Sequence, residues 1–303
     1  MERRNMTGHL LAIFTIVLWG TTFIATKVLL KDFSPFEILI IRFVIGFVVL
    51  FILSPIPIKI TSLKEELTFA LAGLTGLTLY YMLENIALTY TSTANVGVIV
   101  SMVPFFTGIF SMIVFKGQEP MKPTFFVGFL VSMAGVVLIS FNGSQVHVNP
   151  FGDFLSLLAA IVWGIYSILT KKIGMMGYNT IKTTRRMFFY GILWMIPIML
   201  YEKVHISVAD FIKPINLGNF LFLGIGASAI CFLTWSLSVK LIGVIKTSVY
   251  IYASPVVTVV ASAIILKEQI TLLLVIGMVL TLVGLLVSEN KIVIKRKQQE
   301  VYR

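Results

Sequence analysis

The chain has 303 residues, of which 58% are hydrophobic and only 12% charged, with a mean hydropathy of +0.98 and a formal net charge of +11. Soluble domains carry about 25% charged residues, so the composition excludes a water-soluble protein and indicates an integral membrane protein. The excess of Lys and Arg does not indicate nucleic-acid binding, because the charges lie between apolar runs instead of forming one face. Cys231 is the only cysteine, which excludes an intrachain disulfide and a cysteine-based metal site.

Ten apolar runs of about 20 residues, the length that a transmembrane helix needs, follow one another along the chain. The first run follows Arg3 and Arg4, as in a signal peptide, but it is too long for one and no clear cleavage site follows it. We interpret it as a retained first span and predict an all-α integral membrane protein with ten transmembrane helices. The expected spans are roughly 8–30, 34–53, 67–89, 94–115, 123–141, 153–171, 183–201, 217–239, 247–266 and 271–288.

The connectors between these runs are asymmetric in charge. If the N-terminus is cytoplasmic, that side holds 18 Lys and Arg residues and the opposite side holds 5, with Arg42 left inside a span. Because positive residues concentrate in cytoplasmic loops, we expect a multi-pass protein of the cytoplasmic membrane with both termini in the cytoplasm. The basic segment 289–303 is then a cytoplasmic tail.

The first half of the chain is repeated in the second half. A shift of 144 positions, without a gap, matches Gly8 with Gly152, Trp19-Gly20 with Trp163-Gly164, Lys27 with Lys171 and Arg42 with Arg186. The correspondence resumes at shifts of 151 and 149, which match Pro104 with Pro255, Lys116 with Lys267, Glu119 with Glu268, Gly128 with Gly277 and Gly135 with Gly284. An internal repeat decides the architecture, and we expect the two copies to cover 8–141 and 152–288.

Each copy holds five predicted spans, which is an odd number. The second copy must therefore enter the membrane from the side opposite to the first, so the two copies are inverted. Inverted repeats are typical of secondary transporters, in which the binding site lies near the membrane midplane between the halves.

With these features the sequence resembles the drug/metabolite transporter superfamily, specifically its EamA-type permeases with two five-helix repeats. Tyr178-Asn179 departs from the pattern, because it stands where the first copy has Ser34-Pro35. The resemblance implies a ten-helix permease that moves amino acids or related small metabolites, often outward, by alternating access around a central cavity. It covers about 8–288 and rests on Trp19-Gly20, Trp163-Gly164, Ser34-Pro35, Arg42, Pro104, Pro255, Glu119, Glu268, Gly128, Gly135, Gly277 and Gly284.

Two ionisable residues lie well inside predicted spans, Arg42 in the second and Glu84 in the third. A charge at this depth is costly and faces the bundle interior, so both are candidate substrate-binding residues. Glu84 could hold a substrate amine or a proton, and Arg42 a carboxylate. The alternatives are a structural ion pair between them, or an arginine that reaches outward to the interface. Tyr81 and Asn85 share the helical face of Glu84 and are further candidates.

Tryptophans and prolines recur at matching positions in the two copies. Trp19 and Trp163 lie halfway along their spans, where an indole N–H needs a partner, so they line the cavity or pack helices. Pro104 and Pro255 each remove a backbone hydrogen bond. Interrupted helices at matching places point to a transporter site, so we expect gating there, with a simple packing kink as the alternative. Tyr252, beside the second proline, is a candidate substrate contact.

The paired glycines lie two helical turns apart, which places each pair on one face of its helix. Gly128 pairs with Gly135, and Gly277 pairs with Gly284. Small residues permit close helix approach. We expect these faces to pack within one subunit, or to serve as an oligomer surface.

Neither a cofactor nor a metal is expected. His9, His147 and His205 are scattered at span ends or in loops, and no GxxxxGK nucleotide-binding loop occurs. The leading hypothesis is a secondary transporter for a small polar or amphipathic metabolite, not an enzyme, with a proton as a candidate coupling partner. One alternative is an intramembrane enzyme on lipid substrates, although the clustered His or paired Asp expected for it are missing. The other is a membrane sensor without transport.

Overall fold

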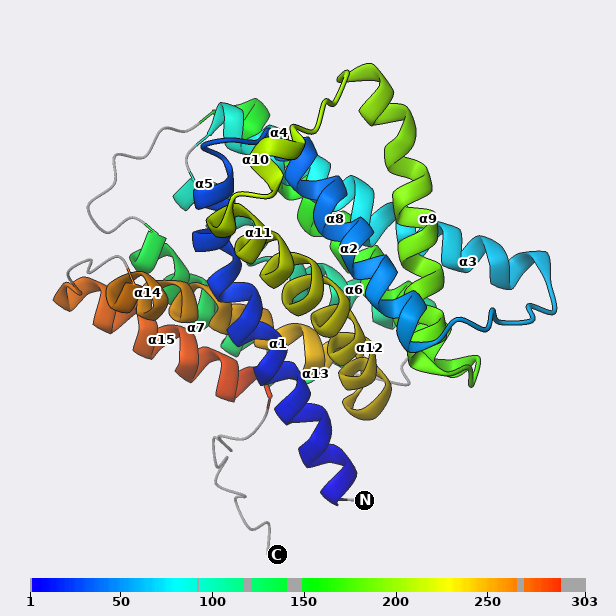
Figure 1. Cartoon of the computed structure of the whole chain (residues 1–303). Coiled ribbons are helices and arrows are strands. Elements are labelled where there is room, and N and C mark those ends of the chain that lie inside the picture. Colours follow the sequence, from blue (N-terminus) through cyan, green and yellow to red (C-terminus); the bar gives the residue numbers. More distant parts are fainter. Residues whose placement is uncertain (1, 92, 117–120, 141–148, 266–269, 290–303) are drawn as a thin grey trace, which may run out of the picture.

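The structure is a computed structural model that describes residues 2–91, 93–116, 121–140, 149–265 and 270–289. Every regular element in these residues is a helix, and the helices form one bundle (Figure 1). The first half holds α1 (Glu2–Leu29), α2 (Pro35–Leu53), α3 (Leu63–Gly73), η1 (Leu74–Leu79), α4 (Tyr80–Tyr90), α5 (Thr93–Val100), α6 (Val103–Phe115) and α7 (Pro123–Ser140).

The second half follows the same order, with α10 and η3 as additional elements. It holds α8 (Pro150–Met175), α9 (Thr180–Tyr201), the short α10 (Val208–Phe211), α11 (Pro214–Leu221), η2 (Phe222–Ile230), α12 (Cys231–Ile242), α13 (Val244–Val249), η3 (Tyr250–Ala253), α14 (Ser254–Ile265) and α15 (Leu272–Ser288). Consecutive helices join into ten rods, and each rod falls on one of the ten runs predicted from the sequence.

Eight of the described rods are long and apolar enough to cross a membrane by length and composition. The tenth rod, α15, is apolar but only 17 residues long. The seventh, α9, has 22 residues and carries Lys182, Arg185 and Arg186 in its first two turns. The predicted fold class, an all-α multi-pass membrane protein, is confirmed.

Short polar residues begin the second helix of each half. Ser34 caps α2 in a capping box, in which its side chain accepts from Glu37 N and the Glu37 side chain accepts from Ser34 N. In the second half, Asn179 caps α9 by accepting hydrogen bonds from the backbone N–H groups of Ile181 and Lys182. Although Tyr178-Asn179 differs from Ser34-Pro35, the second helix of each half therefore begins with a side-chain cap.

Equivalent helices of the two halves pack against equivalent partners in the other half. α2 packs against η2, and its counterpart α9 packs against α3 and η1; α1 packs against α12 and α14, and α8 packs against α4 and α6. Figure 1 shows α7 and α15 side by side, where the fifth helices of the two halves meet. The core of the bundle is therefore built between the halves, not within each of them.

Two kinds of helix irregularity recur at matching places. The third rod of each half contains a π-helical segment, η1 or η2, and π-helical turns are rare and concentrate at functional sites. The fourth rod is interrupted just before its proline: α6 begins beside Pro104, and the 3₁₀ segment η3 precedes Ser254 and Pro255. The predicted interruptions are present, whereas their use in gating stays a prediction.

The glycine faces contact each other within one chain. A side chain at Gly128 would collide with Gly284 and Ser288, and one at Gly135 would collide with Gly277. Close approach of α7 and α15 requires glycine at these positions. All four glycines are buried, so the expectation of an oligomer surface there was wrong, and the alternative of packing within the subunit holds. Glu119 and Glu268, which contributed to the family resemblance, lie outside the described residues.

The two ends of the described chain lie on the same side of the bundle. Nδ1 of His9 in α1 lies 3.5 Å from the carboxylate of Glu289, just after α15. The hydroxyl of Tyr250 in η3 lies 2.8 Å from His9 and 3.2 Å from Glu289. An even number of crossings returns the chain to its starting side, as in a ten-span topology.

Candidate functional site

Tryptophan rings from the first helices of the two halves contact each other inside the bundle. The rings of Trp19 in α1 and Trp163 in α8 lie edge to face, with centroids 5.4 Å apart. Trp235 and Phe232 of α12 lie 5.3 and 5.8 Å from Trp19, and Tyr80 of α4 lies 4.6 Å from Trp163. We call these five residues the aromatic cluster; both halves contribute to it.

Trp19 finds its hydrogen-bond partner on a π-helical segment. Its Nε1 donates to the carbonyl of Ala227 in η2 at 2.9 Å. The indole of Trp163 is 4% exposed, and among the described residues its N–H has no hydrogen-bond partner. An unpaired buried N–H is costly and calls for an explanation, so Trp163 is the stronger candidate for contact with a bound molecule.

Arg42 is buried but does not pair with Glu84. Its Nε donates to the hydroxyl of Ser228 in η2 at 3.1 Å. Its guanidinium lies 5.2 Å from the ring centroid of Tyr81 and 5.3 Å from that of Phe43, both at cation–π distance. The ion pairs found within the described residues do not include one between Arg42 and Glu84. The two groups therefore form no direct ion pair, and the charge of Arg42 acts on Glu84 only at longer range.

Glu84 reaches the aromatic cluster through Tyr80. The hydroxyl of Tyr80 donates to Glu84 Oε1 at 3.1 Å, and its ring contacts both Trp163 and Tyr81. Glu84, Tyr81 and Asn85 are each half-buried in α4. The sequence argument had put Tyr81 beside Glu84, but the direct partner is Tyr80, one turn earlier along the same helix.

Tyr252 is not part of the aromatic cluster. Tyr252 is fully buried, its hydroxyl has no hydrogen-bond partner among the described residues, and its ring lies 6.5 Å from that of Phe129. The described ring contacts do not join it to the aromatic cluster. Its role as a substrate contact stays a prediction, as does gating at Pro104 and Pro255.

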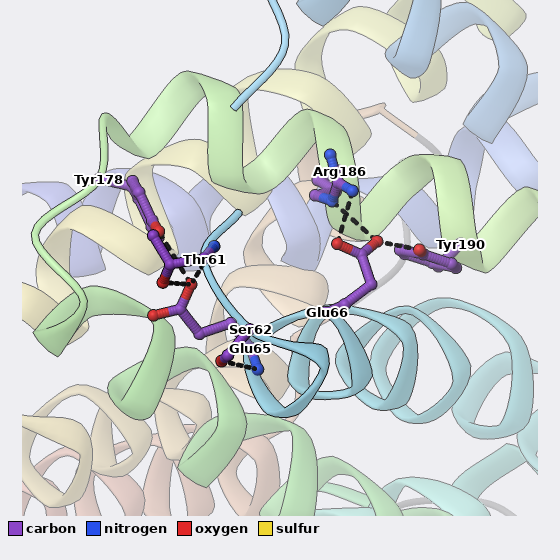
Figure 2. Close-up of polar contacts among 7 residues, drawn as sticks. All are labelled: Thr61, Ser62, Glu65, Glu66, Tyr178, Arg186 and Tyr190. Atoms are coloured by element: carbon purple, nitrogen blue, oxygen red, sulfur yellow. Dashed lines mark hydrogen bonds and ion pairs between the residues drawn. The ribbon is translucent and has the colours of Figure 1, made fainter. Parts of the chain in front are cut away.

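A polar network joins α3 of the first half to α9 of the second (Figure 2). The carboxylate of Glu66 accepts from Arg186 Nε at 3.0 Å and from Nη2 at 2.5 Å, and it also accepts from the Tyr190 hydroxyl. Glu65 accepts from the Tyr178 hydroxyl at 2.8 Å. Burial of the charged groups is only partial, since the Arg186 and Glu66 side chains are 26% and 22% exposed. We call these five residues the α3–α9 network.

A matching network lies between the α1–α2 connector and the start of α11. Asp32 accepts from Asn216 at 2.7 Å and from Lys213 at 3.3 Å, and Lys213 also pairs with Asp210 at 2.7 Å. The hydrogen bond from Asn216 lowers the pKa of Asp32. A lowered carboxyl pKa means that the network is fully formed at neutral pH and is lost only as acid protonates Asp32.

Sequence reasoning missed both networks because the basic residues in them were interpreted only as determinants of membrane orientation. Arg186 was matched to Arg42 by the repeat, yet the structure gives them different partners: a carboxylate for Arg186, and a hydroxyl and aromatic rings for Arg42. The signal available was the acidic pair Glu65-Glu66 just before the predicted span 67–89, together with the basic residues at the start of the seventh span.

Comparison with known proteins identifies the class and the family. The chain matches the model of the EamA-like transporter family twice, over residues 6–141 and 150–289. An uncharacterized transporter of Archaeoglobus fulgidus is 30% identical over 281 residues, which cover 91% of this chain and 96% of the relative. A probable terminal-alkyne amino-acid exporter of Streptantibioticus cattleyicolor is 23% identical over 287 residues, which cover 94% of each chain.

A solved crystal structure shares the fold, with a TM-score of 0.77, 21% sequence identity, and coverage of 93% of this chain and 97% of that chain. The bundle of apolar rods and these relatives define a multi-pass membrane transporter. The chain belongs to the EamA-like transporter family, as the resemblance had indicated.

Proposed function

We propose that this protein is a secondary active exporter of amino acids or related small metabolites, which works by alternating access between the halves 8–141 and 152–288. The observation that carries the proposal is a pair of opposite charges beside the aromatic cluster that form no direct ion pair. Glu84 is bonded to Tyr80 of the cluster, and Arg42 lies at Tyr81 and Phe43, whose rings contact the cluster. The name of the Streptantibioticus cattleyicolor relative supports amino acids as the substrate class.

The chemistry of the site suits a zwitterion with an apolar side chain. An ammonium group is attracted to the Glu84 carboxylate and to aromatic faces, and a carboxylate is attracted to the Arg42 guanidinium. The rings of Trp19 and Trp163 offer apolar surface to the remainder of the molecule. Counterflow of labelled amino acids into proteoliposomes, with empty liposomes as control, tests this proposal.

The two polar networks suit alternating access. Each joins one half of the chain to the other, and they involve equivalent elements: the connector between the first and second helices of one half, and the start of the third rod of the other half. Passage of a substrate requires that one network opens while the other holds. A proton bound at Glu84 is a candidate coupling partner in this cycle.

Replacement of the helix-breaking prolines tests gating. Pro104→Ala or Pro255→Ala restores a backbone donor next to the interruption, and we expect transport to fall while abundance in the membrane stays near normal. Quantitative blotting together with the uptake assay distinguishes a role in gating from a role in packing. A loss of abundance in step with activity would assign these prolines to packing.

Charge asymmetry in the loops predicts that both termini are cytoplasmic. In a Cys231→Ala background, Ser144→Cys should react with an impermeant thiol reagent on intact cells, whereas Lys297→Cys should react only after lysis. Both positions lie outside the described residues, in a connector and in the tail. Equal labelling of the two from outside would contradict the ten-span topology.

A further inference from the structure

One face of α8 carries buried polar groups that have no hydrogen-bond partner of normal geometry among the described residues. Trp163 Nε1, the Tyr166 hydroxyl and Thr170 Oγ1 lie at i, i+3 and i+7, on the same side of the helix. All three residues are at most 4% exposed, and among the described residues none of these atoms has a hydrogen-bond partner. Buried donors are normally paired, so each of these three groups calls for an explanation.

A face of α12 continues this row. The Tyr166 hydroxyl interacts with Thr170 and Ser236, although neither contact has the geometry of a full hydrogen bond. Ser236 Oγ is also buried and unpaired among the described residues. Lys240 lies one helical turn further along α12 and is exposed. We call Trp163, Tyr166, Thr170, Ser236 and Lys240 the hydroxyl track.

The outer part of the track is a small pocket between α8, α9 and α12, lined by both polar and apolar residues. Its polar lining consists of Thr170, Ser236 and Lys240, Tyr178 just before α9, and Thr180 and Thr183 at the start of α9. Ile173, Gly174 and Met187 complete the lining. In this conformation the pocket has space for about one water molecule. Tyr178 also donates a hydrogen bond to Glu65, so the α3–α9 network fixes the position of one residue that lines the pocket.

The donors on the track select a hydrogen-bond acceptor. The indole N–H of Trp163 and the ammonium of Lys240 can only donate, and they stand at the two ends of the row. The three hydroxyls between them can donate as well. The pocket-lining residues include no carboxylate, so Lys240 is the charge that a molecule in the pocket meets. An anionic oxygen group satisfies this set, whereas an ammonium group does not.

We propose that the hydroxyl track is the route by which an anionic oxygen group of the substrate, a carboxylate or a phosphate, passes between the aromatic cluster and the α8–α9–α12 end of the bundle. Lys240 is the first contact at that end. Opening of the α3–α9 network widens the route. The inference rests on the proposed function, since a route needs a transported molecule.

Thiol modification tests the track without knowledge of the substrate. In a Cys231→Ala background, Ser236→Cys in lipid nanodiscs is exposed to two methanethiosulfonates, one carrying a sulfonate and one a quaternary ammonium. We expect the anionic reagent to react faster by about tenfold or more, after correction for the rates with a free thiol, because a single-sign site concentrates its counter-ion. Lys240→Gln should abolish this preference, and Glu66→Gln should raise both rates.

Ile165→Cys is the matched control. Ile165 lies in α8 between Trp163 and Tyr166 but is exposed on the outer surface, so neither charged reagent should modify it. Thr170→Cys serves as a second position on the track if Ser236→Cys does not accumulate. Modification is read as a mass shift of the intact protein.

Two results would overturn the inference. If neither cysteine reacts even in the Glu66→Gln background, the track is not a route. Equal rates for both reagents, unchanged by Lys240→Gln, would mean a water-filled passage without preference for anions. Counterflow assays on the same variants distinguish the two proposals. Anion-selective labelling without transport of any amino acid would contradict the proposed function but not the anion selectivity of the track.

Discussion

Glu84→Gln is expected to lower transport by about tenfold to a hundredfold while leaving the amount of protein in the membrane unchanged. The substitution keeps the shape of the side chain and its bond from Tyr80, and it removes the charge that a substrate ammonium or a coupling proton needs. A hydrogen bond to a charged group contributes about 1.5–3 kcal/mol, and each 1.36 kcal/mol corresponds to a factor of about ten. Initial rates of uptake at matched protein amounts provide the measurement.

The double variant with Arg42→Gln separates function from structure. If the two charges formed a structural pair, each single neutralisation would strand a buried charge and reduce abundance, and the double would restore it. Because Arg42 contacts Ser228 and Tyr81 instead, we expect the double variant to transport no better than the worse single. Glu202→Gln, at the exposed end of α9, is the control for neutralising a carboxylate. A Glu84→Gln protein that is abundant and transports normally removes this residue from the site.

Glu66→Gln is expected to favour the conformation in which the α3–α9 end is open. The carboxylate accepts two hydrogen bonds from Arg186 and one from Tyr190, so neutralisation weakens three contacts that cross from one half of the chain to the other. A partly exposed, bidentate pair contributes about 1 kcal/mol, which is equivalent to about a fivefold shift in the population of the open form. Thiol modification of Ser236→Cys reports that population directly.

Exchange of the charges at Glu66 and Arg186 gives a more specific test of the α3–α9 network. The double variant Glu66→Arg with Arg186→Glu re-creates an ion pair with its partners exchanged, and it should return the modification rate towards that of the parent. Each single reversal places like charges together and should open the end further. Unchanged modification rates in all of these variants would show that the α3–α9 network does not control access.

The fold could be predicted from the sequence because its determinants are local. Length and apolarity define each rod, and the repeated Trp-Gly pairs and prolines show that the rods come in two sets. The contact between the halves could not be derived in the same way. Gly128 and Gly284 were recognised as packing positions, but sequence spacing cannot distinguish a partner helix in the same chain from one in another copy.

The candidate site was predictable only in part. Arg42 and Glu84 stand out because charges are rare in membrane spans, and both reach the central region. Their partners depend on helix register, which the π-helical segments η1 and η2 change by inserting wider turns. For this reason a regular helical period of 3.6 residues could not predict that Ser228 contacts Arg42. The hydroxyls of Tyr166, Thr170 and Ser236, which form no hydrogen bond of normal geometry among the described residues, carry no sequence signal.

The most direct test of the central claim is counterflow with three related molecules: an amino acid with an apolar side chain, the amine that lacks its carboxylate, and the acid that lacks its amino group. If opposite charges around the aromatic cluster bind a zwitterion, proteoliposomes preloaded with the amino acid accumulate the labelled amino acid. The amine and the acid should exchange at least about tenfold more slowly, because each leaves one charge of the site unpaired. Equal exchange of all three, or exchange of none above empty liposomes, would contradict the account.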